Sequence, residues 1–128
     1  YYEDTDAGGV VYHSQYLNFL ERARTEWLRE LGYEQDSIKS EFGLVFAVRS
    51  LEVEYIKPAL FNDQLQINVE IKECRAASIL FQHSITKFIN NQTELILTAM
   101  VKVACVNIEK QAASAIPEPI YKVIKTCM

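Results

Sequence analysis

The chain has 128 residues and a formal net charge of −4 at pH 7. That length suits one domain with a real core, and no linker, repeat or low-complexity tract divides it, so we expect a single domain over residues 1–128. The net charge excludes a general attraction to nucleic acid. The apolar runs are far shorter than a bilayer span, which excludes a membrane-spanning segment.

The cysteines predict the compartment and argue against a metal centre. Cys74, Cys105 and Cys127 are an odd number without metal-ligand spacing, which favours a reducing compartment over a disulfide scaffold. We therefore expect a cytoplasmic protein. Neither a metal nor another cofactor is expected, since the sequence has no ligand cluster and no glycine-rich phosphate loop.

The first informative segment is an acidic, glycine-broken turn at residues 1–13, YYEDTDAGGVVYH. Gly8 and Gly9 permit close approach of a ligand to the main chain. Asp6 supplies a carboxylate beside them. The unpaired N–H groups at the start of the following helix suit a developing negative charge on oxygen. The segment therefore combines a candidate nucleophile or base with a candidate electrophile.

Two helices are predicted next. Apolar residues recur at helical spacing from Ser14, a candidate N-cap, and Gly32 is expected to end this long helix. A short helical turn is predicted from a cap at Asp36 or Ser37 to about Phe42, ended by Gly43.

The remaining pattern is that of strands. Residues 65–72 alternate strictly between apolar and polar side chains, and 44–56, 78–89 and 94–108 are further candidates. Asn90 and Asn91 predict a tight turn between the last two. One long helix followed by four strands with short links predicts an α+β fold, with an antiparallel sheet packed on the helix.

The run from Asp6 to His13, followed by Tyr16 and a charged helix, resembles the signature of hotdog-fold acyl-CoA thioesterases of the 4-hydroxybenzoyl-CoA thioesterase family. The segments 1–6 and 21–26 are similar to the bacterial YbgC-type branch, which is associated with the Tol-Pal envelope system. Further similarity at 53–59 and 74–78 extends the resemblance over most of the chain.

The resemblance implies a hotdog fold, in which a curved sheet wraps the long helix. Its first strand would begin before Tyr1, so we expect the N-terminus to be truncated. Family members assemble as dimers, commonly as dimers of dimers, so a homotetramer is expected. The expected activity is hydrolysis of an acyl-CoA to a free acid and CoA, with acyl carrier protein as a further candidate partner.

The resemblance also assigns the catalytic groups. Asp6 matches the aspartate that attacks the thioester carbonyl or activates water, and both roles stay open. The backbone N–H of His13 matches the group that binds the carbonyl oxygen, while the His13 imidazole has either an auxiliary or a purely local role. Gly8 and Gly9 let the thioester approach.

Other residues are candidates for substrate binding. Tyr12 and Tyr16 could line the acyl pocket or belong to the core. Lys57 and Arg75 are the first candidates for the CoA phosphates, because both lie in segments that resemble the family. Arg49 and Lys87 are further cationic candidates, and Lys87 is expected to be a solvated surface charge.

Two other features of the sequence are predicted to have structural rather than catalytic roles. His83 alternates with apolar residues and is predicted to be a satisfied histidine of the sheet. The charged run at 21–26 is predicted to be a solvated helix face, with a minor role in a subunit contact or pocket wall. Two other functions remain open: a non-catalytic module that binds acyl-CoA or acyl carrier protein, and a hotdog dehydratase of hydroxyacyl thioesters.

Overall fold

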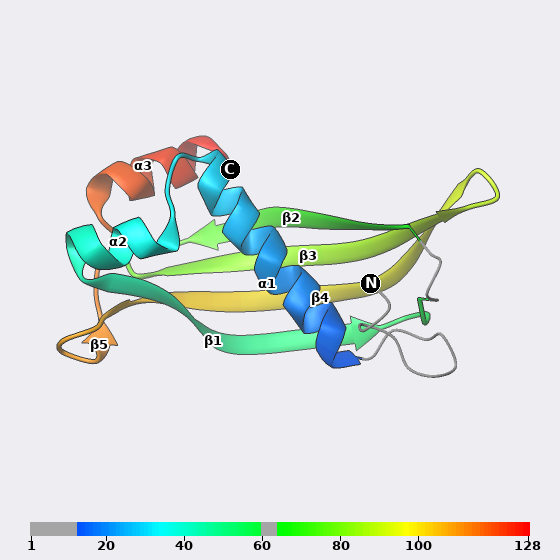
Figure 1. The fold of residues 1–128 in the computed structure, drawn as a ribbon, viewed down its shortest axis with the longest axis horizontal. Helices are drawn as coiled ribbons and strands as arrows, with labels where there is room; N and C mark the ends of the chain where they lie inside the picture. Colours follow the sequence, from blue (N-terminus) through cyan, green and yellow to red (C-terminus); the bar gives the residue numbers. More distant parts are fainter. Residues whose placement is uncertain (1–12, 60–63) are drawn as a thin grey trace.

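The computed structural model describes residues 13–59 and 64–128. These residues form one antiparallel sheet with helix α1 lying across it, while helices α2 and α3 lie together at one end (Figure 1). The predicted α+β fold is confirmed. In chain order the elements are α1 (His13–Glu30), α2 (Gln35–Phe42), β1 (Leu44–Tyr55), β2 (Leu65–Cys74), β3 (Ser78–Ile89), β4 (Gln92–Asn107), β5 (Ala112–Ala113) and α3 (Glu118–Thr126).

Helix α1 packs on the sheet through the apolar stripe that the sequence predicts. Tyr16, Leu20 and Leu28 repeat at three- or four-residue multiples and are all buried. The helix begins at His13, so Ser14 lies inside it and the prediction of Ser14 as N-cap is wrong. Periodicity locates the buried face of a helix but leaves its first residue uncertain by one or two positions.

The end of α1 is the one that the sequence predicts. Gly32 adopts a φ of 95°, which only glycine tolerates easily. The Tyr33 N–H donates to the Leu28 carbonyl at 3.1 Å, and the Gly32 N–H donates to the Arg29 carbonyl at 2.9 Å. This Schellman motif satisfies carbonyl groups that the end of the helix leaves free and turns the chain towards α2.

Helix α2 also ends as predicted, but it begins earlier. Gly43 has a φ of 66° and donates its N–H to the Lys39 carbonyl, which closes the helix. The first helical residue is Gln35, so Asp36 is within the first turn and the predicted cap there is wrong. An acidic side chain in the first turn is favourable because it faces the positive end of the helix dipole.

The sheet has the order β1-β4-β3-β2, with β5 paired to β4, and every pairing is antiparallel. Each of the four predicted strands is confirmed, with ends within two residues of those expected. Asn90 and Asn91 have φ values of 51° and 62°, so β3 and β4 are joined by the tight turn that the Asn-Asn pair predicts.

The core lies between α1 and the facing side of the sheet. Alternate residues of the central strands point to this side, including Ile79, Phe81 and Ile85 of β3 and Val101 of β4, and all are buried. Trp27 of α1 meets Phe81 edge to face, with ring centroids 5.2 Å apart. Such contacts fix α1 over β3 and β4.

Strand β1 is the least covered part of the sheet. Its hydrogen-bonded neighbour within the described residues is β4 alone, and most of its side chains are exposed. Val48 and Leu51 face the same side as the core, yet their exposed fractions are 53% and 41%. An apolar strand edge of this length is normally covered by another chain or element.

Strand β5 and helix α3 are not among the elements predicted above. Ile120 and Ile124 of α3 are fully buried, which anchors the helix on the end of the sheet near β2. Their four-residue spacing, after the prolines at 117 and 119, is the signal that predicts such a helix.

Candidate functional site

The candidate site begins at the first residue of α1. His13 occupies that position, so its backbone N–H is one of the groups that a helix leaves without an internal partner. The side chain of His13 and the predicted site residues Asp6, Gly8, Gly9 and Tyr12 lie outside the described part of the chain.

Tyr16 fastens the start of α1 to the segment that follows β1. Its side chain is buried, and its hydroxyl oxygen accepts a hydrogen bond from the Ala59 N–H at 2.9 Å. Its ring also lies 5.9 Å from the ring of Tyr55, at the end of β1. The structure therefore places Tyr16 in the core beside the helix start, where it fixes the relation between α1 and the 55–59 segment.

Lys57 lies at the same end of the molecule as the helix start. Its Nζ atom is 3.7 Å from Glu94 Oε1, and Lys87 Nζ is 4.0 Å from Glu94 Oε2. Two lysines thus share the Glu94 carboxylate. The Lys87 side chain is only 11% exposed, so the prediction of a solvated surface charge is wrong for this residue.

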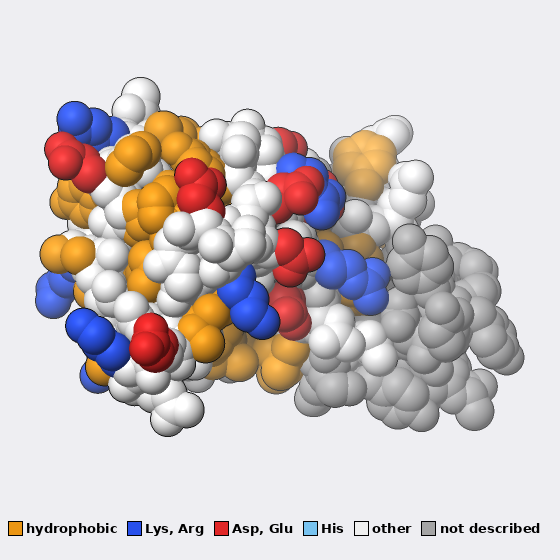
Figure 2. All heavy atoms as spheres, turned by 60° about the vertical axis from the view of Figure 1, so that its left-hand side comes forward, with side chains coloured by type: hydrophobic (Ala, Val, Ile, Leu, Met, Phe, Trp, Pro, Cys, Tyr) orange, Lys and Arg blue, Asp and Glu red, His pale blue; other side chains and the backbone are white. Residues whose placement is uncertain are grey.

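Arg75 lies at the opposite end of the sheet, directly after β2, where its side chain pairs with Glu73. The ten residues of β2 separate the two ends by about 30 Å. The structure therefore does not bring Arg75 and Lys57 of one chain together. Figure 2, in which this end of the molecule is turned forward, shows basic and acidic side chains interleaved with apolar ones, and no continuous basic surface.

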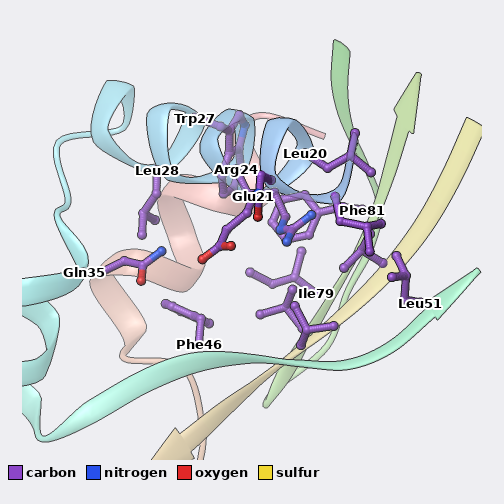
Figure 3. A pocket seen from close by; sticks show the side chains of 15 residues that line it. Leu20, Glu21, Arg24, Trp27, Leu28, Gln35, Phe46, Leu51, Ile79 and Phe81 are labelled. Carbon is purple, nitrogen blue, oxygen red and sulfur yellow. The ribbon is translucent and has the colours of Figure 1, made fainter. Parts of the chain in front are cut away.

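A cavity of about 310 Å³ lies between α1 and the sheet. Glu21 and Arg24 point from α1 into it, with Gln35 at one end and Leu51 at the other (Figure 3). Most of the lining is apolar. The lining residues are Leu17, Asn18, Leu20, Glu21, Arg24, Trp27, Leu28, Gln35, Phe46, Val48, Leu51, Ile79, Phe81, Val101 and Val103.

Arg24 is joined to the sheet by a buried histidine. Its Nη1 atom lies 3.0 Å from Nε2 of His83, a residue of β3 that is fully buried. Because a guanidinium only donates, Nε2 is the acceptor and the hydrogen of the neutral imidazole is on Nδ1. His83 Nδ1 has no hydrogen-bond partner among the described residues. The prediction of a satisfied sheet histidine is therefore confirmed at Nε2 but not at Nδ1, for which the backbone of Asn68 is not in good hydrogen-bond geometry.

Both groups of this pair have shifted pKa values. Burial, assisted by the charge of Arg24, lowers the pKa of His83 to about 4, against a smaller opposing effect from the backbone of Asn68. His83 is consequently neutral at physiological pH. Burial also lowers the pKa of Arg24, partly offset by the nearby negative charge of Glu21.

The other charges of this helix segment face outward. Arg22 lies over the ring of Phe19, with its guanidinium carbon 5.6 Å from the centroid, and Glu26 pairs with Arg29 at the surface. The segment thus divides as predicted into a solvated face and a part of a pocket wall. Sequence spacing alone does not show that Glu21 and Arg24 are the two residues on the wall.

The cysteines have no sign of a reactive or ligating role in the described residues. Cys74 and Cys105 are buried, and burial raises the pKa of both thiols. No cluster of metal-ligating side chains occurs among residues 13–59 and 64–128. Within the same ranges, no helix is both long and apolar enough to cross a bilayer.

Comparison with known proteins agrees with this architecture. Residues 2–124 match the thioesterase-like superfamily. An acyl-CoA thioesterase YbgC of Haemophilus influenzae is 43% identical over 120 residues, covering 94% of this chain and 85% of the relative. An acyl-CoA thioester hydrolase YbgC of Escherichia coli O6:H1 is 43% identical over 125 residues, covering 98% of this chain and 90% of the relative.

A solved structure agrees at the level of the fold. The 4-hydroxybenzoyl CoA thioesterase of Pseudomonas sp. strain CBS-3 superposes with a TM-score of 0.87 at 22% identity, covering 96% of this chain and 92% of that one. The sheet with one long helix across it is a hotdog fold. The chain belongs to the thioesterase-like superfamily, within which it is similar to the YbgC proteins.

Proposed function

We propose that this chain hydrolyses acyl-CoA thioesters, with Asp6 as the catalytic carboxylate and the His13 backbone N–H as the oxyanion donor. One observation carries the proposal: α1 begins at His13, seven residues after Asp6, in a chain that is 43% identical to acyl-CoA thioesterases. An N–H group at a helix start is preorganised to bind a developing negative charge, because neighbouring peptide dipoles point the same way.

The reaction needs only a few protein groups. Asp6 either attacks the thioester carbon or removes a proton from the water that attacks it, and the His13 N–H binds the oxygen that becomes negative. The carbon–sulfur bond then breaks, and the CoA thiolate leaves and takes up a proton. On the route in which Asp6 attacks, water then hydrolyses the acyl–Asp6 mixed anhydride to the free acid and regenerates the carboxylate. A thiolate is a good leaving group, so no further acid is required. Gly8 and Gly9 leave room for the thioester against the main chain.

The acyl group enters the cavity beneath α1. Leu17, the first lining residue, is about 6 Å along the helix axis from His13, so the cavity begins one turn from the oxyanion donor. Its volume of about 310 Å³ is roughly twice that of an apolar cavity that holds benzene. This size supports acyl groups of medium length, or single aromatic rings with substituents.

Lys57 is the first candidate for a CoA phosphate, because it lies at the end of the sheet that holds the start of α1. Its pairing with Glu94 is long and half exposed, so a phosphate competes well for it. Because β2 separates Arg75 from Lys57, the two residues do not bind the same phosphate of one CoA. Arg75 contacts either a different part of that CoA or a CoA bound by another copy of the chain.

A homodimer forms through the open edge of β1. Pairing of this edge with a second copy would satisfy the backbone groups that no described strand pairs, and would cover Val48 and Leu51. Phe46, Val48 and Leu51 also line the cavity, so the same contact would enclose the acyl group. A tetramer follows if two such dimers pack together.

The protein acts in the cytoplasm, where its thiols stay reduced and acyl-CoA is available. It needs no cofactor, because the carboxylate and the helix start supply the chemistry. Acyl carrier protein is a further partner if its thioester reaches the same site. A dehydratase would need a catalytic histidine paired with a carboxylate, whereas Nε2 of His83 is bonded to Arg24.

The activity is tested with a panel of acyl-CoA thioesters of different length and polarity, with the released thiol measured in a colorimetric assay. We expect turnover of at least one class at kcat values of the order of 1 s⁻¹ or more. Binding of acyl-CoA with no turnover above the uncatalysed rate would instead identify a non-catalytic binding module.

A further inference from the structure

The guanidinium of Arg24 has donors that no described residue uses. Arginine carries five N–H donors, and the described contact is the single hydrogen bond to His83. No carboxylate among residues 13–59 and 64–128 lies within ion-pair distance of Arg24. Arg24 is half-buried and lines the cavity, and none of its nitrogens is both fully buried and without a partner, so its unused donors are open to the cavity or to solvent (Figure 3).

The orientation of Arg24 is maintained at a cost. His83 accepts from Nη1, and its own Nδ1–H is buried beside the Asn68 backbone without a well-aligned hydrogen bond. An unsatisfied buried donor is destabilising, so a chain selected for stability alone would not favour this arrangement. His83 therefore acts as a positioning residue, which holds a desolvated cation at the wall of an otherwise apolar cavity.

Glu21 gives the cavity wall a second polar group of opposite character. It lies one turn before Arg24, lines the same cavity with an exposed side chain, and contributes only acceptors. A hydroxyl is the small group that satisfies both, since it accepts from Arg24 and donates to Glu21. A carboxylate would gain from Arg24 but would be repelled by Glu21, and a methyl group would make no hydrogen bond with either.

We propose that Arg24 and Glu21 select acyl groups that carry a hydroxyl far from the thioester. The inference rests on the proposed function, because it takes the cavity as the acyl site and the start of α1 as the thioester site. Glu21 and Arg24 follow His13 by eight and eleven residues, and helical side chains lean back by about one turn. The selected oxygen is therefore roughly 7–11 Å from the thioester carbon.

The experiment compares three acyl-CoA probes of equal length: octanoyl-CoA, 8-hydroxyoctanoyl-CoA and the half thioester of octanedioic acid. For the wild-type enzyme we expect kcat/KM to be highest for the 8-hydroxy probe. A fourth probe, 3-hydroxyoctanoyl-CoA, controls for position, and we expect no comparable advantage because its hydroxyl lies next to the reacting carbon.

Two variants should shift the preference in different directions. Arg24→Met should lower the ratio of 8-hydroxyoctanoyl to octanoyl kcat/KM by about tenfold or more, and should lower turnover of the dicarboxylic probe as well. Glu21→Met should lower the same hydroxy ratio but raise turnover of the dicarboxylic probe, because the repulsion is removed. Arg29→Met, on the solvent face of the same helix, is the matched control and should leave all ratios unchanged.

His83 provides a test that does not depend on replacing Arg24. His83→Gln keeps an acceptor for Nη1 and should preserve the hydroxy ratio, whereas His83→Leu should lower it as Arg24→Met does. Circular dichroism and a thermal melt check that each variant is folded. If Arg24→Met does not fold, the ratio of 8-hydroxyoctanoyl to octanoyl kcat/KM is measured in Glu21→Met and His83→Leu instead.

The outcomes separate this inference from the proposed function. If no probe or other acyl-CoA is hydrolysed, both fail. If the wild-type enzyme hydrolyses acyl-CoA but the variants change all probes by one common factor, or leave the hydroxy ratio unmoved, the selection by Arg24 and Glu21 is overturned while the thioesterase function stands.

Discussion

Replacing His83 by glutamine should remove a large part of the acid sensitivity of the fold. Burial and the charge of Arg24 lower the pKa of His83 from 6.5 to about 4 in the folded chain. The unfolded chain therefore binds a proton more readily. The stability due to the neutral imidazole is fully present above pH 6.5 and is lost as the pH falls from 6.5 towards 4.

The expected loss follows from the two pKa values. It is about 2 kcal/mol at pH 5 and approaches about 3 kcal/mol once the folded form is also protonated. Other groups titrate in the same range, so the measured quantity is the difference between wild-type and His83→Gln. Glutamine retains an acceptor for the Arg24 guanidinium but cannot take a proton. The free energy of unfolding of His83→Gln therefore lacks this contribution to its pH dependence.

Urea denaturation of both proteins at pH 8, 6 and 5, at one fixed protein concentration, provides the free energies of unfolding. The difference between the two proteins should change by about 2 kcal/mol between pH 8 and 5, with wild-type losing more stability. Parallel curves for the two proteins would show that His83 does not titrate differently in the folded and unfolded chains, and would refute this account of the buried pair.

Three other changes test separate parts of the structure. Ile120→Ala should lower the free energy of unfolding by about 2–5 kcal/mol in chemical denaturation, because Ile120 is the fully buried side chain that packs α3 on the sheet; a change below 1 kcal/mol would show that α3 contributes little to the core. Leu51→Lys should shift sedimentation from dimer to monomer and reduce activity, whereas an unchanged dimer would place the subunit contact elsewhere than β1. Lys57→Ala should raise the KM for acyl-CoA about threefold to tenfold with little change in kcat, and more than Arg75→Ala does; the reverse order would move the phosphate site to the far end of the sheet.

Much of the fold could be predicted because its signals are local. Gly32 and Gly43 end helices at positions where a left-handed residue is required, and Asn90-Asn91 joins two strands through a turn that favours such residues. Helix α3 was not predicted, although the spacing of Ile120 and Ile124 carries its signal. The helix caps at Ser14 and Asp36 were misplaced because several polar residues near each helix start could serve as caps.

The candidate site could be predicted only in part. Asp6 and the start of α1 are neighbours along the chain, so one motif indicates both. The contact between Arg24 and His83 joins residues 59 positions apart, and no local pattern specifies which helix face meets which strand. For the same reason Lys57 and Arg75 looked equivalent in the sequence, although the sheet separates them by about 30 Å.

The central claim, that Asp6 performs thioester hydrolysis, is tested most directly by the turnover number of Asp6→Asn. The asparagine keeps the shape of the side chain but can neither attack a carbonyl nor accept a proton, so kcat on the best acyl-CoA substrate should fall by a factor of about 10²–10⁴ while the thermal melt is unchanged. A folded Asp6→Asn protein that retains the wild-type kcat at saturating substrate would contradict the account.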